Sequence, residues 1–153
     1  MIQAPRTPDE HRDFCAFASD AIGAPVNPEG VATIGIRRDK EIAAVAVYHH
    51  YDGHGVELAL GSTTPRWATP HAISAVLTFP FIHLGVQRLS AQCRLSNKRS
   101  QRLMKGVGFM REGKLHCFYP DNGHAVIFGM TRPYFLRSKW HGYGGSGRRS
   151  SRR

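Results

Sequence analysis

Near the start of the chain, apolar residues recur at the spacing of one helix face. They are Phe14, Cys15, Phe17, Ala18 and Ile22. Thr7 or Asp9 can begin this helix, because both side chains can accept hydrogen bonds from free backbone amides. The segment 23–30 contains two prolines and two glycines, so it predicts the end of the helix and a loop after it.

The pattern then changes to alternation, which is typical of strands. Apolar and polar residues alternate over 31–37 and again over 41–51, and the short polar segment 38–40 between them predicts a tight hairpin turn. A third run of alternation covers 56–61, after a turn at 52–55. The sequence therefore predicts three consecutive strands, the first two of them antiparallel.

A second change of period follows residue 65 and predicts a helix that faces the core. Thr69 is a good N-cap and Pro70 suits the first helical position. The apolar residues on one face of this helix are Ile73, Val76, Leu77, Phe81 and Leu84. Pro80 lies inside it, so we expect the regular helix to kink or end there. Alternation returns over 86–95 and predicts another strand.

The last part of the pattern joins a short helix to two strands. Ser96 or Asn97 can cap a helix over 98–107, and Gly108 can end it. Strands are expected over 110–118 and 124–131, with a turn at 120–123. The full order of helices and strands predicts an α/β fold in which helices cover both faces of one twisted sheet.

Composition limits the architecture and the compartment. A chain of 153 residues with 41% hydrophobic residues is long enough for one core but short for two domains. Its three cysteines are odd in number and form no C-x-x-C pair, so we expect buried thiols in a reducing, cytoplasmic compartment. The first residues are polar, and no apolar run approaches the length of a membrane span. We expect a soluble protein that does not bind membranes.

The positive charge is concentrated at the C-terminal end. The net charge is +10, but six of the 21 basic residues follow residue 136, which leaves 15 basic and 11 acidic residues, or +4, before it. We expect a domain over 1–136 and a basic tail rich in Gly, Ser and Arg over 137–153. The tail either only increases solubility or contacts nucleic acid or an acidic protein surface.

The helix expected over 98–107 is itself strongly basic. Its basic residues are Lys98, Arg99, Arg102 and Lys105. Free amides and the positive end of a helix dipole favour an anion at a helix N-terminus. An anionic ligand is therefore expected nearby.

This region also resembles a known family. Asn97-x-x-Ser100, Leu103, Gly108-Phe109 and the run Glu112-Gly113-Lys114-Leu115 are similar to the second half of a GNAT-superfamily N-acetyltransferase. Upstream, Trp67-Ala68-Thr69, Phe79-Pro80-Phe81 and the run from Leu84 to Leu89 resemble the preceding helix and strand of bacterial and phage members. The resemblance covers roughly 57–140 and is strongest to enzymes that acetylate the N-terminal alanine of ribosomal proteins.

The resemblance implies a GNAT-like, mainly antiparallel sheet and acetyl-CoA as co-substrate. In this family the strand that matches 56–61 splays from the one that matches 86–95, and the pantetheine arm enters the gap. Backbone groups of Leu58, Ala59 and Leu60 are expected to bond the cofactor amides, and Asn97 to contact the pantetheine. The pyrophosphate is expected at the start of the helix after Thr69.

The expected pyrophosphate loop departs from the family pattern. Relatives carry glycines there, whereas 64–71 reads TPRWATPH and contains none. The residues expected around the phosphates are Arg66, Trp67, Ala68 and Thr69 from this loop, and Arg99 and Arg102 from the basic helix. Arginine side chains can contact phosphates directly and offset lost backbone contacts.

Acetyl transfer to an amine requires a base for the ammonium proton and an acid for the departing thiolate. The resemblance implies Ser100 as the acid, because relatives are thought to use this serine. Glu57 lies on the strand beside the expected acyl site and is the candidate base, with Tyr119 as an alternative acid. Ser100 could equally be a solvent-exposed helix residue, and Glu57 a surface charge.

Three histidines close together, His49, His50 and His54, suggest a metal site. Adjacent residues on a regular strand point to opposite faces, so His49 and His50 could not both bind one ion, and we expect no metal.

The sequence leaves three functions open. The first is an N-acetyltransferase that acts on a protein N-terminus or a lysine. The second is a GNAT scaffold without turnover, such as a component of a phage particle, anchored by its basic tail. A nucleic-acid-binding protein is third, although no RNA-recognition or helix-turn-helix pattern is present.

Overall fold

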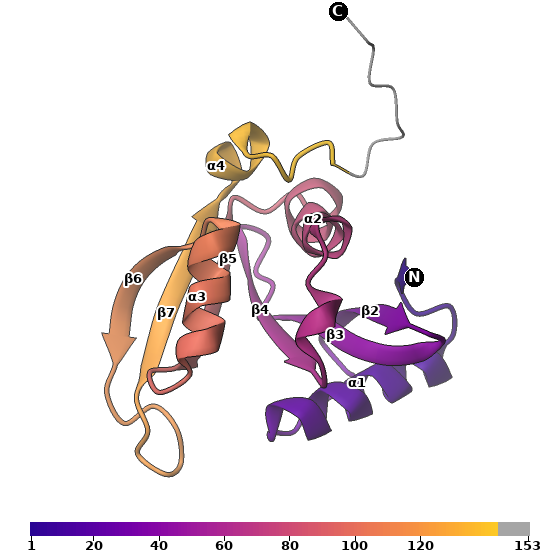
Figure 1. Ribbon diagram of the computed structural model, residues 1–153, viewed down its shortest axis with the longest axis horizontal. Coiled ribbons are helices and arrows are strands. Elements are labelled where there is room, and N and C mark those ends of the chain that lie inside the picture. The colour runs from indigo at the N-terminus through magenta and orange to yellow at the C-terminus, as the bar shows by residue number, and fades with distance from the viewer. Residues whose placement is uncertain (144–153) are drawn as a thin grey trace, which may run out of the picture.

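A computed structural model describes residues 1–143, which form one sheet with helices on both faces (Figure 1). The helices are α1 (Pro8–Ile22), α2 (Pro70–Thr78), α3 (Lys98–Val107) and α4 (Arg132–Arg137). The strands are β1 (Ile2–Gln3), β2 (Ala32–Arg38), β3 (Glu41–His49), β4 (Gly55–Ser62), β5 (Arg88–Arg94), β6 (Met110–Leu115) and β7 (Ala125–Thr131). They form a sheet in the order β1-β2-β3-β4-β5-β7-β6, antiparallel except between β4 and β5. The expected mixed α/β, mainly antiparallel fold is confirmed.

Helix α1 covers one face of the first half of the sheet. Thr7 is its N-cap and accepts a hydrogen bond from the amide of Glu10, which decides between the two expected caps. The helix lies very close to the strands, because a Cβ atom at Gly35 would come within 2.4 Å of the Phe14 ring. A Cβ atom at Gly61 would come within 3.1 Å of the Ala18 backbone. Glycine at these two positions therefore lets α1 approach the sheet.

The opposite face carries the larger core, under α2 and α3. Tyr48, Leu77, Phe81 and Phe128 belong to this cluster and are fully buried. Trp140 also belongs to it, and its indole N–H donates to the carbonyl of Val107 at 2.7 Å. Alternation along β3 explains the division, because Ala44, Ala46 and Tyr48 face this core while Val45 and Val47 face α1.

The expected helices and central strands are confirmed, with differences at the ends of the chain. The hairpin between β2 and β3 turns through Asp39 and Lys40, both with positive φ, as a tight turn of this kind requires. The sequence did not predict β1 or α4, because each is too short to show a period. Cys15 is buried as expected, whereas Cys117 is exposed, so the expectation of a buried thiol was wrong there.

The expected boundary after residue 136 stays a prediction, because most of the basic tail lies outside the described residues. Of the residues beyond that boundary, Trp140 is only 5% exposed, and its carbonyl accepts a hydrogen bond from the buried Ser74 hydroxyl. The chain therefore packs against the core at least as far as this tryptophan. Within residues 1–143, no helix combines the length and the apolar character that a membrane crossing needs.

Pro80 ends the regular part of α2, as expected. The α-helix stops at Thr78 and continues as a π-helical turn, η2 (Phe79–His83), in which the amide of Leu84 donates to the carbonyl of Phe79. A proline has no N–H to donate to the carbonyl four residues earlier, which here is that of Val76. The hydroxyl of Tyr48 donates to this carbonyl at 2.6 Å instead. Burial raises the pKa of Tyr48 well above its ordinary value, so the hydroxyl stays protonated as a donor.

Replacing this tyrosine tests the bond between sheet and helix. We expect Tyr48→Phe to lower the free energy of unfolding by about 1–3 kcal/mol, because a buried carbonyl loses its donor. Urea unfolding measures the change. Tyr51→Phe removes a hydroxyl from an exposed ring and is the matched control, with an expected change within about 0.5 kcal/mol. Equal stability of the two variants would show that the Tyr48 bond does not hold α2 to β3.

Candidate functional site

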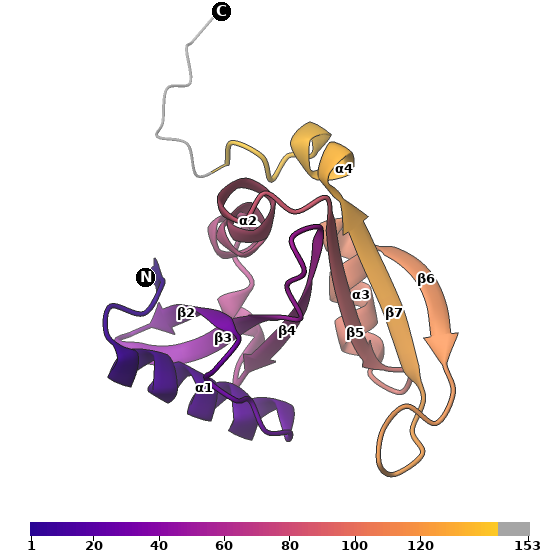
Figure 2. The same cartoon turned by 180° about the vertical axis from the view of Figure 1, so that it is seen from behind.

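The site begins where the two parallel strands at the centre of the sheet separate. β4 and β5 pair over four residues each, from Gly55 opposite Arg88 to Leu58 opposite Ala91. Beyond that point β4 continues to Ser62 and β5 to Arg94 without pairing each other. The two halves of the sheet diverge visibly there (Figures 1 and 2). Backbone groups that face the gap have no partner on the opposite strand, which is the arrangement that the resemblance implied.

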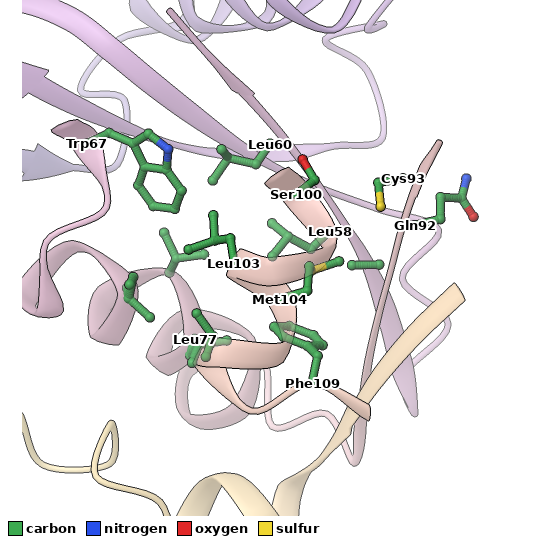
Figure 3. A pocket seen from close by; sticks show the side chains of 14 residues that line it. Leu58, Leu60, Trp67, Leu77, Gln92, Cys93, Ser100, Leu103, Met104 and Phe109 are labelled. Atoms are coloured by element: carbon green, nitrogen blue, oxygen red, sulfur yellow. The ribbon is translucent and has the colours of Figure 1, made fainter. Parts of the chain in front are cut away.

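Helix α3 lies over this gap and closes an apolar cavity. The cavity holds about 120 Å³ and is lined from β4, α2, β5 and α3. Its residues include Leu58, Leu60, Trp67, Leu77, Ala91, Cys93, Ser100, Leu103, Met104 and Phe109. Figure 3 shows Leu103 and Met104 on the side of α3 that faces this space, with Ser100 at the end of the helix near Leu60. Most of the wall is hydrocarbon and sulfur, and the Ser100 hydroxyl is one of its few polar groups.

A second, more polar cavity of about 360 Å³ continues from the first toward the start of α3. Leu60, Trp67, Ser100 and Leu103 line both cavities, so the two adjoin. Of the residues expected to bind the cofactor, Leu60, Trp67, Ala68, Asn97 and Arg99 line this second cavity. Leu58 lines the apolar cavity, whereas four other expected residues line neither cavity: Ala59, Arg66, Thr69 and Arg102. The structure therefore brings together most of the expected phosphate and pantetheine residues, but not all of them.

The N-terminus of α3 is fixed by two polar side chains. The side-chain oxygen of Asn97 accepts a hydrogen bond from the amide of Ser100 at 3.1 Å, which makes Asn97 the N-cap rather than Ser96. The sequence did not single out Gln101, which is buried and donates to the carbonyl of Leu95 at 2.7 Å. The cap and this bond hold the first turn of α3, and with it Ser100, beside the gap.

Most backbone amides of the loop before α2 donate hydrogen bonds within the loop itself. The amide of Arg66 donates to the Thr64 hydroxyl, and the amides of Ala68 and Thr69 donate to carbonyls of Pro65 and Trp67. The Thr69 hydroxyl caps α2 by accepting from the amide of Ala72. Two further positions, 65 and 70, are prolines. The backbone therefore offers few donors to a pyrophosphate here, in keeping with the absence of glycine.

The opposite face of β4 carries a cluster of polar side chains. Glu57 points to the α1 side, away from Leu58, and lines a third cavity together with His49 and Arg88. Its carboxylate lies 2.9 Å from Nδ1 of His50 and 3.5 Å from Nδ1 of His49. Burial lowers the pKa of His49 below its ordinary value, although the nearby carboxylate acts in the other direction.

The two histidines face the same side, so the prediction that they diverge was wrong. His50 lies one residue past the end of β3 with a φ of 54°, in the left-handed region. The regular alternation of a strand does not extend to it, and its ring meets that of His49 at 3.1 Å between the two Nδ1 atoms. The expectation that no metal binds here therefore loses its geometric basis.

Gln92 of β5 lines the apolar cavity, the Glu57 cavity and a larger groove of about 620 Å³. This groove lies between the loop after α1 and the loop after β6, and Tyr119 is part of its wall. Tyr119 packs against the guanidinium of Arg94 at 4.1 Å, and burial raises the pKa of its hydroxyl. The alternative acid therefore lies on the same face as Glu57 and away from Ser100. Gln92 therefore borders cavities on both faces of the sheet, the α3 side and the α1 side.

The sequence did not assign a role to Gln92, Cys93 or Met104. The inward alternation of β5 placed Cys93 on the face of Ala91, and burial raises the pKa of its thiol. No sequence pattern pointed to Gln92, because its position beside the gap depends on where the pairing of β4 and β5 stops. Met104 follows Leu103 on α3 and widens the apolar stripe of the helix.

The Glu112-Gly113 motif has a structural role beside the site. Glu112 of β6 makes a two-pronged ion pair with Arg88 of β5, at 3.0 and 2.6 Å. This pair lowers the pKa of the Glu112 carboxyl. It passes over Gly129 of β7, where an added Cβ would collide with the carboxylate. Three neighbouring strands are therefore clamped at one end of the gap.

Comparisons with known proteins agree on one kind of fold. A family model described as an acetyltransferase (GNAT) domain matches residues 1–110. Among solved structures, a chimera of the spermidine N-acetyltransferase SpeG from Vibrio cholerae with hSSAT has a TM-score of 0.72 at 10% identity, covering 89% of this chain and 99% of that one. A protein from T. thermophilus, provisionally assigned as an acetyltransferase, has a TM-score of 0.66 at 22% identity, covering 88% and 87%. A search of curated proteins gave no match.

The cap of α3 can be tested directly. We expect Asn97→Ala to lower the free energy of unfolding by about 0.5–2 kcal/mol, because the Ser100 amide loses its acceptor. Ser96→Ala, one residue earlier on an exposed position, is the control and should change stability by less than about 0.5 kcal/mol. Urea denaturation of both variants gives the comparison. A larger loss for Ser96→Ala would move the cap to that residue.

Proposed function

Because the chain belongs to the GNAT acetyltransferase family, we propose that it transfers an acetyl group from acetyl-CoA to a primary amine. The observation that carries this proposal is the early end of β4–β5 pairing, with two adjoining cavities along the gap. A gap of this shape offers free backbone groups to the amides of a pantetheine arm and an apolar wall to its methylene groups. Acetyl-CoA is therefore the co-substrate we assign to it.

In this assignment the pantetheine arm lies along β4. Backbone groups of Leu58, Ala59 and Leu60 bond its amides, and Asn97 contacts it from the start of α3. The pyrophosphate lies in the polar cavity beside Arg99. Since the loop amides are largely used internally, the Arg99 side chain supplies the main charged contact to the phosphates.

The proposed reaction uses groups from both faces of the sheet. The amine nitrogen attacks the thioester carbonyl, and the C–S bond breaks. Glu57 takes the ammonium proton, directly or through water, so that the nitrogen lone pair is available. Ser100 gives its proton to the departing sulfur, and the second proton that the nitrogen loses as the amide forms returns to Ser100 through water. The gap in the sheet lets the acetyl group, held on the α3 side, meet an amine that arrives from the α1 side.

We propose a protein N-terminus or a lysine side chain as the acceptor. The groove of about 620 Å³ on the α1 side lies between two loops and is lined mainly by apolar residues, which suits the side chains of a peptide. The V. cholerae enzyme is named for spermidine, a polycation. Glu29 and Glu57 are the carboxylates lining the groove and the adjoining Glu57 cavity, and His49 and Arg88 accompany them there. This charge pattern favours one amine rather than a polyamine.

A second function, a scaffold without turnover, is favoured by the pyrophosphate loop alone. Loop amides that already donate to Thr64, Pro65 and Trp67 must give up these bonds before they can bind a phosphate. If that cost is too high, the fold keeps its binding surfaces but not its co-substrate. The proposed contacts of the basic tail with nucleic acid or an acidic protein surface involve residues outside those described.

Ser100→Ala separates the two functions. We expect wild-type protein to bind acetyl-CoA in calorimetry and to acetylate a peptide amine. Ser100→Ala should lower kcat about 100-fold or more, as loss of a general acid does, while acetyl-CoA affinity changes little. Ser96→Ala is the matched serine control and should turn over normally. Absence of acetyl-CoA binding by wild-type protein would favour the scaffold, and unchanged turnover in Ser100→Ala would remove Ser100 from the mechanism.

Two arginines on one helix test the phosphate contacts. Arg99 lines the polar cavity whereas Arg102 does not, although both are exposed on α3. We expect Arg99→Gln to weaken acetyl-CoA binding about 10–100-fold, which corresponds to the loss of a charged hydrogen bond. Arg102→Gln should have a much smaller effect. Calorimetry at low and high salt gives the comparison, and equal losses would assign the effect to the general charge of the helix.

A further inference from the structure

The polar cluster on the α1 side has the geometry of a metal site. Its three ligand atoms are Nδ1 of His49, Nδ1 of His50 and a carboxylate oxygen of Glu57. The two nitrogens are 3.1 Å apart, and they lie 3.5 and 2.9 Å from the oxygen. Ligands about 2.0–2.1 Å from a tetrahedral zinc ion are about 3.3 Å apart. The three atoms therefore already form one triangular face of such a tetrahedron.

The backbone explains how this face arises. His50 leaves β3 in the left-handed region, which turns its ring back toward His49. Glu57 lies on the neighbouring strand directly opposite His49 in the β3–β4 register. Two ligands that are adjacent in sequence and one from the next strand thus meet without any movement of the chain.

The donor types select a class of ion. Two imidazoles and one carboxylate suit zinc and similar transition ions, whereas magnesium and calcium prefer oxygen ligands. The His50 side chain is 74% exposed, so water can reach the fourth position. Arg88 lines the same cavity, but Glu112 pairs with its guanidinium and balances its charge. In residues 1–143, this is the one group of three or more His, Cys, Asp or Glu ligands with converging atoms.

We propose that His49, His50 and Glu57 bind a divalent transition metal ion of the zinc class, and that the bound ion blocks acetyl transfer by occupying the Glu57 carboxylate. The binding site stands on geometry alone. The block rests on the proposed function, because it requires Glu57 to serve as the base for the incoming amine. The ion acts as an inhibitor that competes with the acceptor, not as a cofactor.

Binding is tested without reference to activity. Zinc is titrated calorimetrically into protein without a histidine tag, and cobalt is added separately to record the visible absorption of a tetrahedral Co²⁺ ion. We expect one ion per chain. His50→Asn keeps a residue that tolerates positive φ but removes a ligand. It should weaken zinc binding at least about 10-fold, because loss even of a ligand's hydrogen-bond partner costs that much.

His54→Asn is the matched control, since His54 is exposed nearby and does not belong to the cluster. It should bind zinc and cobalt like the wild type. Absence of zinc binding by wild-type protein would overturn the site. Equal affinity of wild type and His50→Asn would also overturn it, because the ion would then be bound elsewhere.

The block is tested by kinetics, with each variant compared with its own rate in a chelator. We expect zinc to raise the KM for the peptide amine and to leave the KM for acetyl-CoA unchanged. The zinc concentration that halves the rate should rise at least about 10-fold in His50→Asn, in step with its weaker binding. Full turnover with zinc bound would overturn the proposed inhibition, and so would equal inhibition of wild type and His50→Asn. The calorimetric result tests the binding site separately.

Discussion

The structure depends on the point at which two parallel strands stop pairing. β4 and β5 are joined up to Leu58 and Ala91 and then diverge, which splits the sheet into two halves. Buried backbone groups must find partners, so a gap of this kind is stable only if something else satisfies them. Helix α3 covers the gap from one side without pairing these groups, which leaves them for water or a ligand, and the ion pair of Arg88 with Glu112 joins β5 to β6 across β7 beside the gap. The cavities, the two faces and the proposed passage for the acetyl group all follow from this divergence.

Much of this arrangement could be predicted from the sequence. The periods of 2 and 3.6 residues located the longer helices and strands, because one side of each is buried in a shared core. Capping chemistry placed the starts of α1, α2 and α3 within a residue or two. Pro80 correctly marked the end of regular α2, but the donation from Tyr48 that compensates for it joins residues far apart in the chain. Such partners leave no local pattern.

The candidate site was less predictable for the same reason. Asn97 and Ser100 were singled out by the family resemblance and Arg99 by the basic charge of the same helix, and all three line the polar cavity. Gln92 became notable only through the position of the gap. The convergence of the two histidines was missed because regular strand geometry was assumed at His50, where a single positive φ reverses the direction of the ring. Arg102 lies almost one turn after Arg99 on α3, farther from the start of the helix where the polar cavity lies, and does not line that cavity. The number of loop amides available to a phosphate could not be predicted, because it depends on which of them donate hydrogen bonds within the loop.

The two walls of the proposed co-substrate site are therefore unequal: α3 is capped and rich in arginine, while the facing loop has few free donors. The most direct test is the backbone amide NMR spectrum of labelled protein during acetyl-CoA titration. The account predicts that the largest shift changes fall on both sides of the gap, at residues 58–62 and 92–94, and at the start of α3, with smaller changes over 64–69. Changes confined to the loop or to other surfaces, or none at saturating acetyl-CoA, would contradict the assignment of the gap as the co-substrate site.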